Sequence, residues 1–406
     1  MRKIIFNWYY DRRDLTEYIL QIFGDTRLYF LYHAKEQPVP EYLQKHSNVS
    51  VIYWNDFTTP YGLIKSINPD AIVFHDIESF HQVGLNIAAK NLSIVTFILQ
   101  HGLRTYYDVQ YLFENNYSRL NVGLSGTSFK TMRFFLSSLR MKNFSQMPSL
   151  IKFIFYRKIY DLTIALKKSQ FSLRTADYYI ELSEINTTFH KERDNIPDEK
   201  FIITGNPLFD GYVDSLNKAI GSHKEENYVL LVDCPFECDN GIDIPLFSLE
   251  QKNDYLKQIA KLAGEENYLL KVKLHPKSYG TKGLVTDPNL IYCRDEDIIE
   301  LAKTANYVIF VHYSSVTPVL LGYKKCIYID LGGDVQRKLF EMVGVEGYSL
   351  NNLLNTKTRL GEIATVVSLE KLDKLLFKID GRSAERVRNA IVQKIEMHKS
   401  KNKLTG

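Results

Sequence analysis

The chain has 406 residues, of which 45% are hydrophobic and 24% are charged, and its formal net charge is +4. This length exceeds the usual size of one hydrophobic core and favours two domains, whereas the ordinary composition excludes an intrinsically disordered chain. The modest charge and the absence of a nucleic-acid-binding motif argue against a nucleic-acid partner.

The N-terminal segment MRKIIFNWYYDRR lacks the apolar core of a secretion signal, and no run of 18 apolar residues predicts a membrane span. Four cysteines show no metal-ligand spacing. These features predict a cytoplasmic protein with reduced thiols.

Short apolar runs alternate with polar or amphipathic stretches through the whole chain. Strands are expected at 3–6, 28–32, 50–53, 71–74 and 94–99 in the first half, and at 228–232, 268–274, 307–311 and 326–330 in the second. The alternation predicts an α/β fold with one parallel sheet in each half. The polar stretch 214–227 predicts the linker. The domains are therefore expected at 1–213 and 228–380, and a final helix within 381–406 either caps the second domain or crosses back to the first.

A basic segment at about 127–174 is predicted as a helical insertion into the first domain. It contains ten Lys or Arg and one acid, Asp161, interspersed with aromatic and aliphatic residues. Its cations suit an anionic membrane surface into which the apolar side chains would dip, which would place the protein at the inner face of the cytoplasmic membrane. A solvated helical hairpin explains the same composition equally well.

Polar residues follow several expected strands, at the sheet edge where open α/β sheets bind ligands. In the first half these are Asp76 and Glu78, then His101, then Gly205 and Asn206. His101 is the first candidate for a general base because imidazole titrates near neutral pH, and Asp76 or Glu78 is the second. Helix capping by the two acids and a simple turn at 205–206 are the structural alternatives.

In the second half, the expected strand 268–274 is followed by His275 and Pro276, and the strand 307–311 leads into Tyr313-Ser314-Ser315. Two hydroxyls at a helix N-terminus can bind a phosphate group. The structural alternative is that the same serines simply cap the helix. His275 could donate to that phosphate or protonate it as it leaves. The predicted donor-binding residues are Lys273, His275, Pro276, Tyr313, Ser314, Ser315, Gly205 and Asn206.

The segments Lys-Leu-His-Pro at 273–276 and Tyr-Ser-Ser at 313–315 resemble the HP and SS motifs of bacterial sialyltransferases and polysialyltransferases. They are equally similar to motifs of the CDP-glycerol glycerophosphotransferases. The latter family also has a His-Gly similar to that at 100–102 and a Gly-x-Pro-x-x-Asp similar to that at 205–210.

This resemblance implies a GT-B fold, with two Rossmann-like domains facing a cleft, and a cytidine-nucleotide donor with no essential metal. It also implies that His275, Ser314 and Ser315 contact the donor phosphate. The acidic triplet of the sialyltransferases has no match in the first half, where residues 75–78 are the nearest substitute. His312 stands where the glycerophosphotransferases commonly have Asp.

The leading hypothesis is an inverting, metal-independent glycosyltransferase. It would use a CMP-activated acidic sugar, sialic acid or a related ulosonic acid, to build a capsule or lipopolysaccharide glycan. A CDP-glycerol-type polyol phosphate transferase of teichoic-acid-like or capsule polymer synthesis is the alternative. A UDP-sugar epimerase and a non-catalytic polysaccharide-binding protein on the same fold also stay open. No cofactor is expected; the partners are a nucleotide-activated donor and a glycan acceptor.

Overall fold

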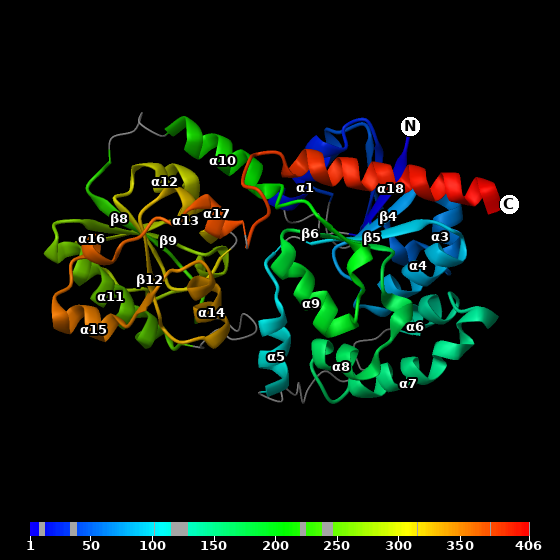
Figure 1. Cartoon of the computed structure of the whole chain (residues 1–406), viewed down its shortest axis with the longest axis horizontal. Helices are drawn as coiled ribbons and strands as arrows, with labels where there is room; N and C mark the ends of the chain where they lie inside the picture. Colours follow the sequence, from blue (N-terminus) through cyan, green and yellow to red (C-terminus); the bar gives the residue numbers. More distant parts are fainter. Residues whose placement is uncertain are drawn as a thin grey trace. The chain divides into compact units, whose positions relative to one another are not determined.

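The computed structural model describes residues 1–7, 13–32, 39–100, 102–114, 129–219, 225–237, 247–314, 316–373 and 375–405. The chain divides into two compact units (Figure 1). Unit 1 comprises Met1–Leu208 and Arg382–Gly406, and unit 2 comprises Phe209–Gly381.

Unit 1 is built on a parallel sheet of seven strands in the order β3-β2-β1-β4-β5-β6-β7. Neighbouring residues of β1 belong to different cores: Ile5 packs into one cluster, and Ile4 and Phe6 into the other. Successive strand residues point to opposite faces, so both faces of the sheet are covered. The strands are β1 (Lys3–Asn7), β2 (Arg27–Tyr32), β3 (Val49–Tyr53), β4 (Ala71–Phe74), β5 (Val95–Leu99), β6 (Tyr178–Glu181) and β7 (Phe201–Ile203).

The helices of unit 1 lie on both sides of this sheet (Figure 1). Phe134, Phe135 and Phe153 of the predicted basic insertion pack into the core on one side. The described part of that insertion, from residue 129, is therefore a helical layer of the domain. The helices are α1 (Arg13–Ile22), α2 (Glu41–Gln44), α3 (Pro60–Ile67), α4 (Phe80–Asn91), α5 (Tyr106–Glu114), α6 (Phe129–Leu136), α7 (Met147–Tyr156), α8 (Leu162–Ser169) and α9 (Glu184–Asp194), with 3₁₀ turns η1 (Trp54–Asp56), η3 (Met141–Gln146), η4 (Ser172–Arg174) and η5 (Asp198–Lys200).

The C-terminal helix α18 (Ser383–Thr405) belongs to unit 1. Its buried residues Val387, Ile391 and Ile395 recur every four positions and join the core that contains Ile4. Figure 1 shows this helix, in red, on the same side of the sheet as α1. The chain therefore crosses back to its first domain, one of the two courses that the sequence left open.

Unit 2 has a parallel sheet of six strands in the order β10-β9-β8-β11-β12-β13. The strands are β8 (Tyr228–Val232), β9 (Leu269–Lys273), β10 (Leu290–Cys293), β11 (Tyr307–Phe310), β12 (Cys326–Ile329) and β13 (Gly347–Tyr348). The helices are α10 (Leu208–Ala219), α11 (Leu249–Glu265), α12 (Ile298–Thr304), α13 (Thr317–Tyr323), α14 (Asp334–Met342), α15 (Leu350–Thr356), α16 (Leu360–Ile363) and α17 (Leu369–Leu372), with the 3₁₀ turn η6 (Pro276–Ser278).

Helix α10 occupies the start of the stretch that the sequence analysis assigned to the linker. Phe209, Val213 and Leu216 recur at helical spacing on this helix and are buried, whereas the polar residues between them face outward. The units consequently divide at 208/209 and not within 214–227. Among the described residues, no helix combines the length and the apolar character needed to cross a bilayer.

Candidate functional site

The strand order of unit 2 reverses at β8, because β9 and β10 continue on one side of it and β11 to β13 on the other. Ligands of open α/β sheets bind beyond the carboxyl ends of the strands at such a reversal. Three polar residues follow the strands that meet there: Asp233 after β8, His275 after β9 and His312 after β11. This edge of the sheet is the candidate site of unit 2.

A buried lysine organises the loops at this edge. Lys252, on α11, has no solvent exposure. Its Nζ donates to Asp233 Oδ2 at 3.1 Å, to Glu237 Oε2 at 2.8 Å and to Ser278 Oγ at 3.2 Å. Asp233 Oδ2 also accepts from the backbone N–H of His275 at 3.3 Å. Lys252 thus compensates two carboxylates and connects the end of β8 to the turn after β9.

His275 is half-buried at the start of η6. Its Nδ1 accepts from the backbone N–H of Lys277 at 3.2 Å. This bond occupies the lone pair of Nδ1, so the neutral imidazole carries its proton on Nε2. His275 is therefore set up as a hydrogen-bond donor through Nε2.

His312 lies close enough to His275 for the two to interact electrostatically. Burial, together with the nearby imidazole of His275, lowers the pKa of His312 to about 4, so the His312 ring is neutral near pH 7. Within the described ranges, its Nε2 is buried and has no hydrogen-bond partner. A buried ring nitrogen left unsatisfied is unusual and suits a position that a ligand completes.

Tyr313 and Ser314, which directly follow His312, do not share one structural environment. Ser314 Oγ lies 3.1 Å from Thr317 Oγ1, and the N-cap of α13 is Val316, so Ser314 is not the capping residue. The Tyr313 ring is buried against Phe340, with ring centroids 5.7 Å apart. Tyr313 therefore lies in the core. Ser315 lies outside the described residues.

The other predicted donor-binding residues have identifiable structural contacts. Lys273 Nζ donates to the carbonyl of Arg294, and Pro276 is exposed at the first position of η6. Gly205 has a φ of 82°, which favours glycine, and Asn206 Oδ1 accepts from the N–H of Leu208 at 3.1 Å. The Gly205–Asn206 segment therefore makes the turn into α10.

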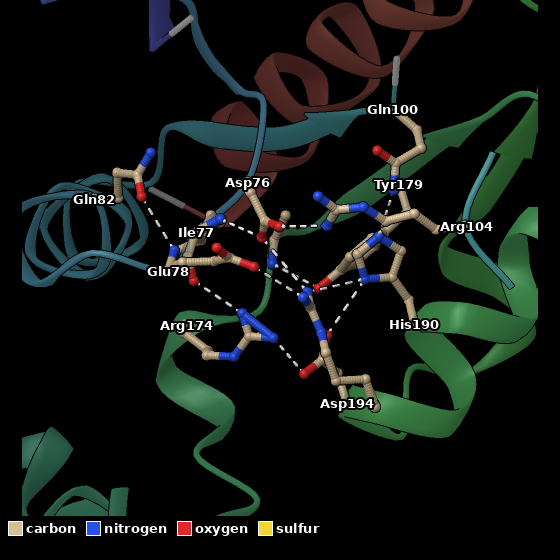
Figure 2. A network of polar contacts seen from close by, with 12 residues as sticks. Asp76, Ile77, Glu78, Gln82, Gln100, Arg104, Arg174, Tyr179, His190 and Asp194 are labelled. Atoms are coloured by element: carbon tan, nitrogen blue, oxygen red, sulfur yellow. Dashed lines mark hydrogen bonds and ion pairs between the residues drawn. The ribbon is translucent and has the colours of Figure 1, made fainter. Parts of the chain in front are cut away.

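Unit 1 contains a second concentration of charge, at the carboxyl ends of β4, β5 and β6. In Figure 2 the side chains of Asp76, Glu78, Arg104, Arg174, His190 and Asp194 converge. Arg193 of α9 has no solvent exposure and donates to three carboxylates: Asp76 at 3.4 Å, Glu78 at 3.0 Å and Asp194 at 2.9 Å. Buried charges are costly unless paired, and here they neutralise one another.

The loop that carries Asp76 and Glu78 is also held through its backbone. Arg174 donates to the carbonyl of Ile77 at 2.8 Å, and Arg157 donates to that of Glu78 at 3.2 Å. Arg104 Nη1 lies 3.3 Å from Asp76 Oδ2, whereas Arg193 donates to Oδ1 of the same carboxylate. Neither predicted acid acts merely as a helix cap.

The two acids differ in protonation. Burial alone would raise the pKa of Asp76, but Arg193, a hydrogen bond with Glu78 and Arg104 hold it well below its ordinary value. Burial and the negative charge of Asp76 raise the pKa of Glu78 to about 8. The Glu78 side chain nevertheless keeps 30% of its surface exposed. A carboxyl group that is reachable and titrates near neutral pH has the properties of a general acid or base.

Glu181, at the end of β6, is a third unusual carboxyl group. Its side chain has no solvent exposure, and burial raises its pKa to about 8. Neither carboxyl oxygen has a hydrogen-bond partner among the described residues. The ring of His190 lies beside it, with Nε2 at 3.5 Å from Glu181 Oε1. Glu181 is therefore a neutral, enclosed acid at pH 7.

His101, the first candidate for the base, lies outside the described residues, so its role stays a prediction. Arg193, Glu181 and Lys252 were not predicted from the sequence. Asp233 was not predicted either, although it directly follows an apolar strand, the signal that identified Asp76. Within the described ranges, no three His, Cys, Asp or Glu side chains are grouped to hold a metal ion.

Neither a protein-family model nor a curated protein sequence matches this chain. Among solved structures it is similar to the wall teichoic acid polymerase TagF, at 13% identity over 97% of this chain and 89% of that one, with a TM-score of 0.53. It is also similar to a proposed UDP-N-acetylglucosamine 2-epimerase from Listeria monocytogenes, at 12% identity over 98% and 97% of the two chains, with a TM-score of 0.51. At these identities the likeness shows the fold. The predicted α/β class, with two Rossmann-like domains of the GT-B type, is confirmed.

Proposed function

We propose that the protein is a transferase that takes a group from a cytidine-nucleotide donor bound by unit 2. The observation that carries this proposal is the position of His275, His312 and Ser314 after β9 and β11, the two strands that flank β8 at the strand-order reversal of that unit. The imidazole N–H of His275 and the hydroxyl of Ser314 are the kinds of donor that bind phosphate oxygens. Because Lys252 compensates Asp233 and Glu237, these carboxylates would repel an anionic ligand less strongly.

A CDP-glycerol donor is the chemistry that we favour, since the likeness to TagF adds to the motif resemblance. In that reaction an acceptor hydroxyl oxygen forms a bond to the phosphorus of the glycerol phosphate, and the bond from that phosphorus to the bridging oxygen of CMP breaks. CMP leaves, and a base takes the hydroxyl proton. The product is a polyol phosphate chain of the teichoic-acid or capsule type.

A CMP-activated acidic sugar is the second donor, supported by the resemblance of residues 273–276 and 313–315 to the sialyltransferase motifs. There the acceptor oxygen attacks the anomeric carbon with inversion, and the bond from that carbon to the phosphate oxygen breaks. Both reactions release CMP and need one proton acceptor. Glu78 is the candidate for that role among the described residues, and His101 remains the alternative.

The donor assignment is tested by thermal shift with CMP, CDP, UMP and UDP, on the wild type and on His275→Ala. A ligand at about 100 times its Kd stabilises the folded state by about 2.7 kcal/mol. We expect the cytidine nucleotides to raise the Tm of the wild type and to lose that effect in His275→Ala. His46→Ala, which removes an exposed histidine of unit 1, is the matched control and should respond like the wild type.

Each other outcome has a definite meaning. If uridine nucleotides stabilise the protein equally well, a UDP-sugar enzyme would be the better interpretation. If no nucleotide changes the Tm, a non-catalytic protein would be favoured. If cytidine nucleotides bind, incubation with CDP-glycerol and with CMP-sialic acid separates the two donors by which one yields CMP.

A further inference from the structure

Exposed apolar side chains are concentrated in the helical insertion of unit 1. Of the twelve large apolar side chains that the described residues expose, six lie between residues 129 and 159: Phe129, Leu136, Phe144, Ile151, Phe155 and Ile159. Scattered exposed apolar residues are normal, but such a concentration in one segment marks an interaction surface.

Helix α7 and the turn after it present these side chains in an ordered way. Ile151, Phe155 and Ile159 recur every four residues, and a helical hydrogen bond from Tyr160 N–H to the Tyr156 carbonyl continues the spacing past the end of the helix. The opposite side of α7 is anchored in the core through Leu150 and Phe153. The exposed stripe is therefore held on a fixed support.

Exposed lysines accompany the stripe. Lys152 and Lys158 are exposed beside Ile151, Phe155 and Ile159, and we call these five residues the α7 face. Among residues 129–174, all described, the only acid is Asp161, which is buried and accepts from the N–H of Thr163 at the start of α8. The segment thus exposes cations and apolar groups without an exposed carboxylate.

One of the two lysines of α8 and the arginine of η4 are engaged elsewhere. Lys167 pairs with Glu192 and lies over the Phe113 ring, 4.6 Å from its centroid. Arg174 is buried in the ion network with Asp194. Lys167 and Arg174 therefore contribute little charge to a binding surface on this segment, whereas Lys168 is exposed and lies over the Tyr160 ring, 4.9 Å from its centroid.

We propose that the α7 face binds the surface of an anionic phospholipid bilayer. Apolar side chains on the outside of an amphipathic helix enter the boundary between headgroups and acyl chains, and flanking lysines attract the anionic headgroups. A protein partner would need acidic groups matched to fixed positions, whereas a bilayer needs only a continuous apolar stripe with cations beside it. This inference is independent of the donor assignment.

The α7 face is also linked to the loop of the candidate base, Glu78. Arg157, which directly follows α7, donates to the backbone carbonyl of Glu78. When the protein is bound to a bilayer through the α7 face, the loop that carries Glu78 would be held by a residue next to the membrane-bound helix. Variants of the α7 face that leave Arg157 unchanged should keep turnover on a soluble acceptor.

The test is sedimentation of the full chain with vesicles of phosphatidylcholine alone and with vesicles that also contain phosphatidylglycerol. We expect binding to the anionic vesicles. Lys152→Gln/Lys158→Gln should weaken it about 25-fold, at about 5-fold per lysine. Ile151→Asp/Phe155→Asp should weaken it by about tenfold or more, because roughly half the burial energy of each side chain is lost. Met397→Asp on α18 is the control, since Met397 is 52% exposed and Phe155 58%, and it should bind like the wild type.

Thermal melting of each variant verifies folding, which these exposed substitutions should not disturb. Absence of wild-type binding to anionic vesicles, or unchanged binding by both double variants, would overturn the proposal. If Ile151→Asp/Phe155→Asp converts a dimer to a monomer in size-exclusion chromatography without changing vesicle binding, the α7 face is a contact between copies of the chain and the proposal is wrong.

Discussion

Arg193 Nη1 donates to Glu78 Oε1 at 3.0 Å from a position that solvent does not reach. The same guanidinium also donates to Asp76, so one cation serves two neighbouring carboxylates that compete for it. Asp76 is held ionised, and Glu78 titrates near neutral pH. A pair of acids whose pKa values are driven apart in this way is typical of acid–base chemistry.

Replacing Glu78 by Gln removes the proposed proton acceptor and keeps the size of the side chain. We expect kcat to fall by about 10²–10⁴-fold, the usual contribution of one general base, while the Kd for CMP is unchanged. In the wild type the rate should rise with pH along a limb centred near 8, because Glu78 accepts a proton only when it is ionised. A Glu78→Gln enzyme that retains this limb would assign it to another group, such as His101.

Asp76→Asn provides a test of the coupling between the two acids. The negative charge of Asp76 raises the pKa of Glu78, so its removal should move the rising limb to lower pH. This displacement distinguishes an electrostatic effect from a loss of folding, which would lower the rate at every pH. A limb that stays in place or moves upward would contradict the coupling.

Arg193→Met should destabilise unit 1 strongly. It leaves Asp76 buried without its main cation and removes one of the two arginines that pair with Asp194, and breaking a buried ion pair costs about 3–5 kcal/mol. Lys191→Met on the same helix is the control, because its partner Asp198 is exposed and a surface pair contributes about 0–1 kcal/mol. Urea denaturation compares the two, and equal effects would show that the network does not stabilise the fold.

The outline of this fold is predictable from sequence because its signals are local. A buried parallel strand is a short apolar run, and a polar residue directly after it lies at the ligand-binding edge, which is how Asp76, Glu78 and His275 were identified. The strand β6 was missed because Tyr178–Glu181 has only one aliphatic residue and ends in a buried acid, so it does not form an apolar run.

The charge networks are not predictable in the same way. Arg193 and Glu78 are 115 positions apart in the chain, and no local sequence pattern at either residue predicts their ion pair. Lys252 lies on an amphipathic helix with many other charged residues, where a lysine is expected on the surface. Only the packing of α11 beside β9 shows that it is buried.

Lys252→Met should weaken nucleotide binding at the candidate donor site, although Lys252 itself is buried. Loss of the ammonium leaves Asp233 and Glu237 uncompensated, which should cost about 3–5 kcal/mol, and it releases the turn that Asp233 fixes through the N–H of His275. We expect weaker cytidine-nucleotide binding as well as a lower Tm. Lys261→Met on the same helix, where Lys261 pairs with exposed Glu265, should change neither property. Normal nucleotide affinity in folded Lys252→Met would show that Lys252 does not position His275.

Glu181 and His190 should affect the stability of unit 1 with opposite dependence on pH. The pKa of Glu181 is raised to about 8, so between about 4.5 and 8 the unfolded chain ionises this group while the folded protein keeps it protonated. Stability is therefore lost as pH rises through that range. The pKa of His190 is lowered by burial to about 4, so between about 6.5 and 4 only the unfolded chain binds the proton, and stability is lost as pH falls. Each contribution can reach about 1.4 kcal/mol per pH unit.

Urea denaturation between pH 4.5 and 8 separates these contributions. Gln imitates a protonated Glu, so Glu181→Gln should become progressively more stable relative to the wild type as pH rises from 4.5 to 8. Asn can keep the hydrogen bond from the Nδ1 position of His190 to Asp194, so His190→Asn should become more stable relative to the wild type as pH falls from 6.5 to 4.5. Differences between variant and wild type that do not change with pH would mean that Glu181 and His190 titrate at ordinary pKa values and that this end of the sheet is open to water.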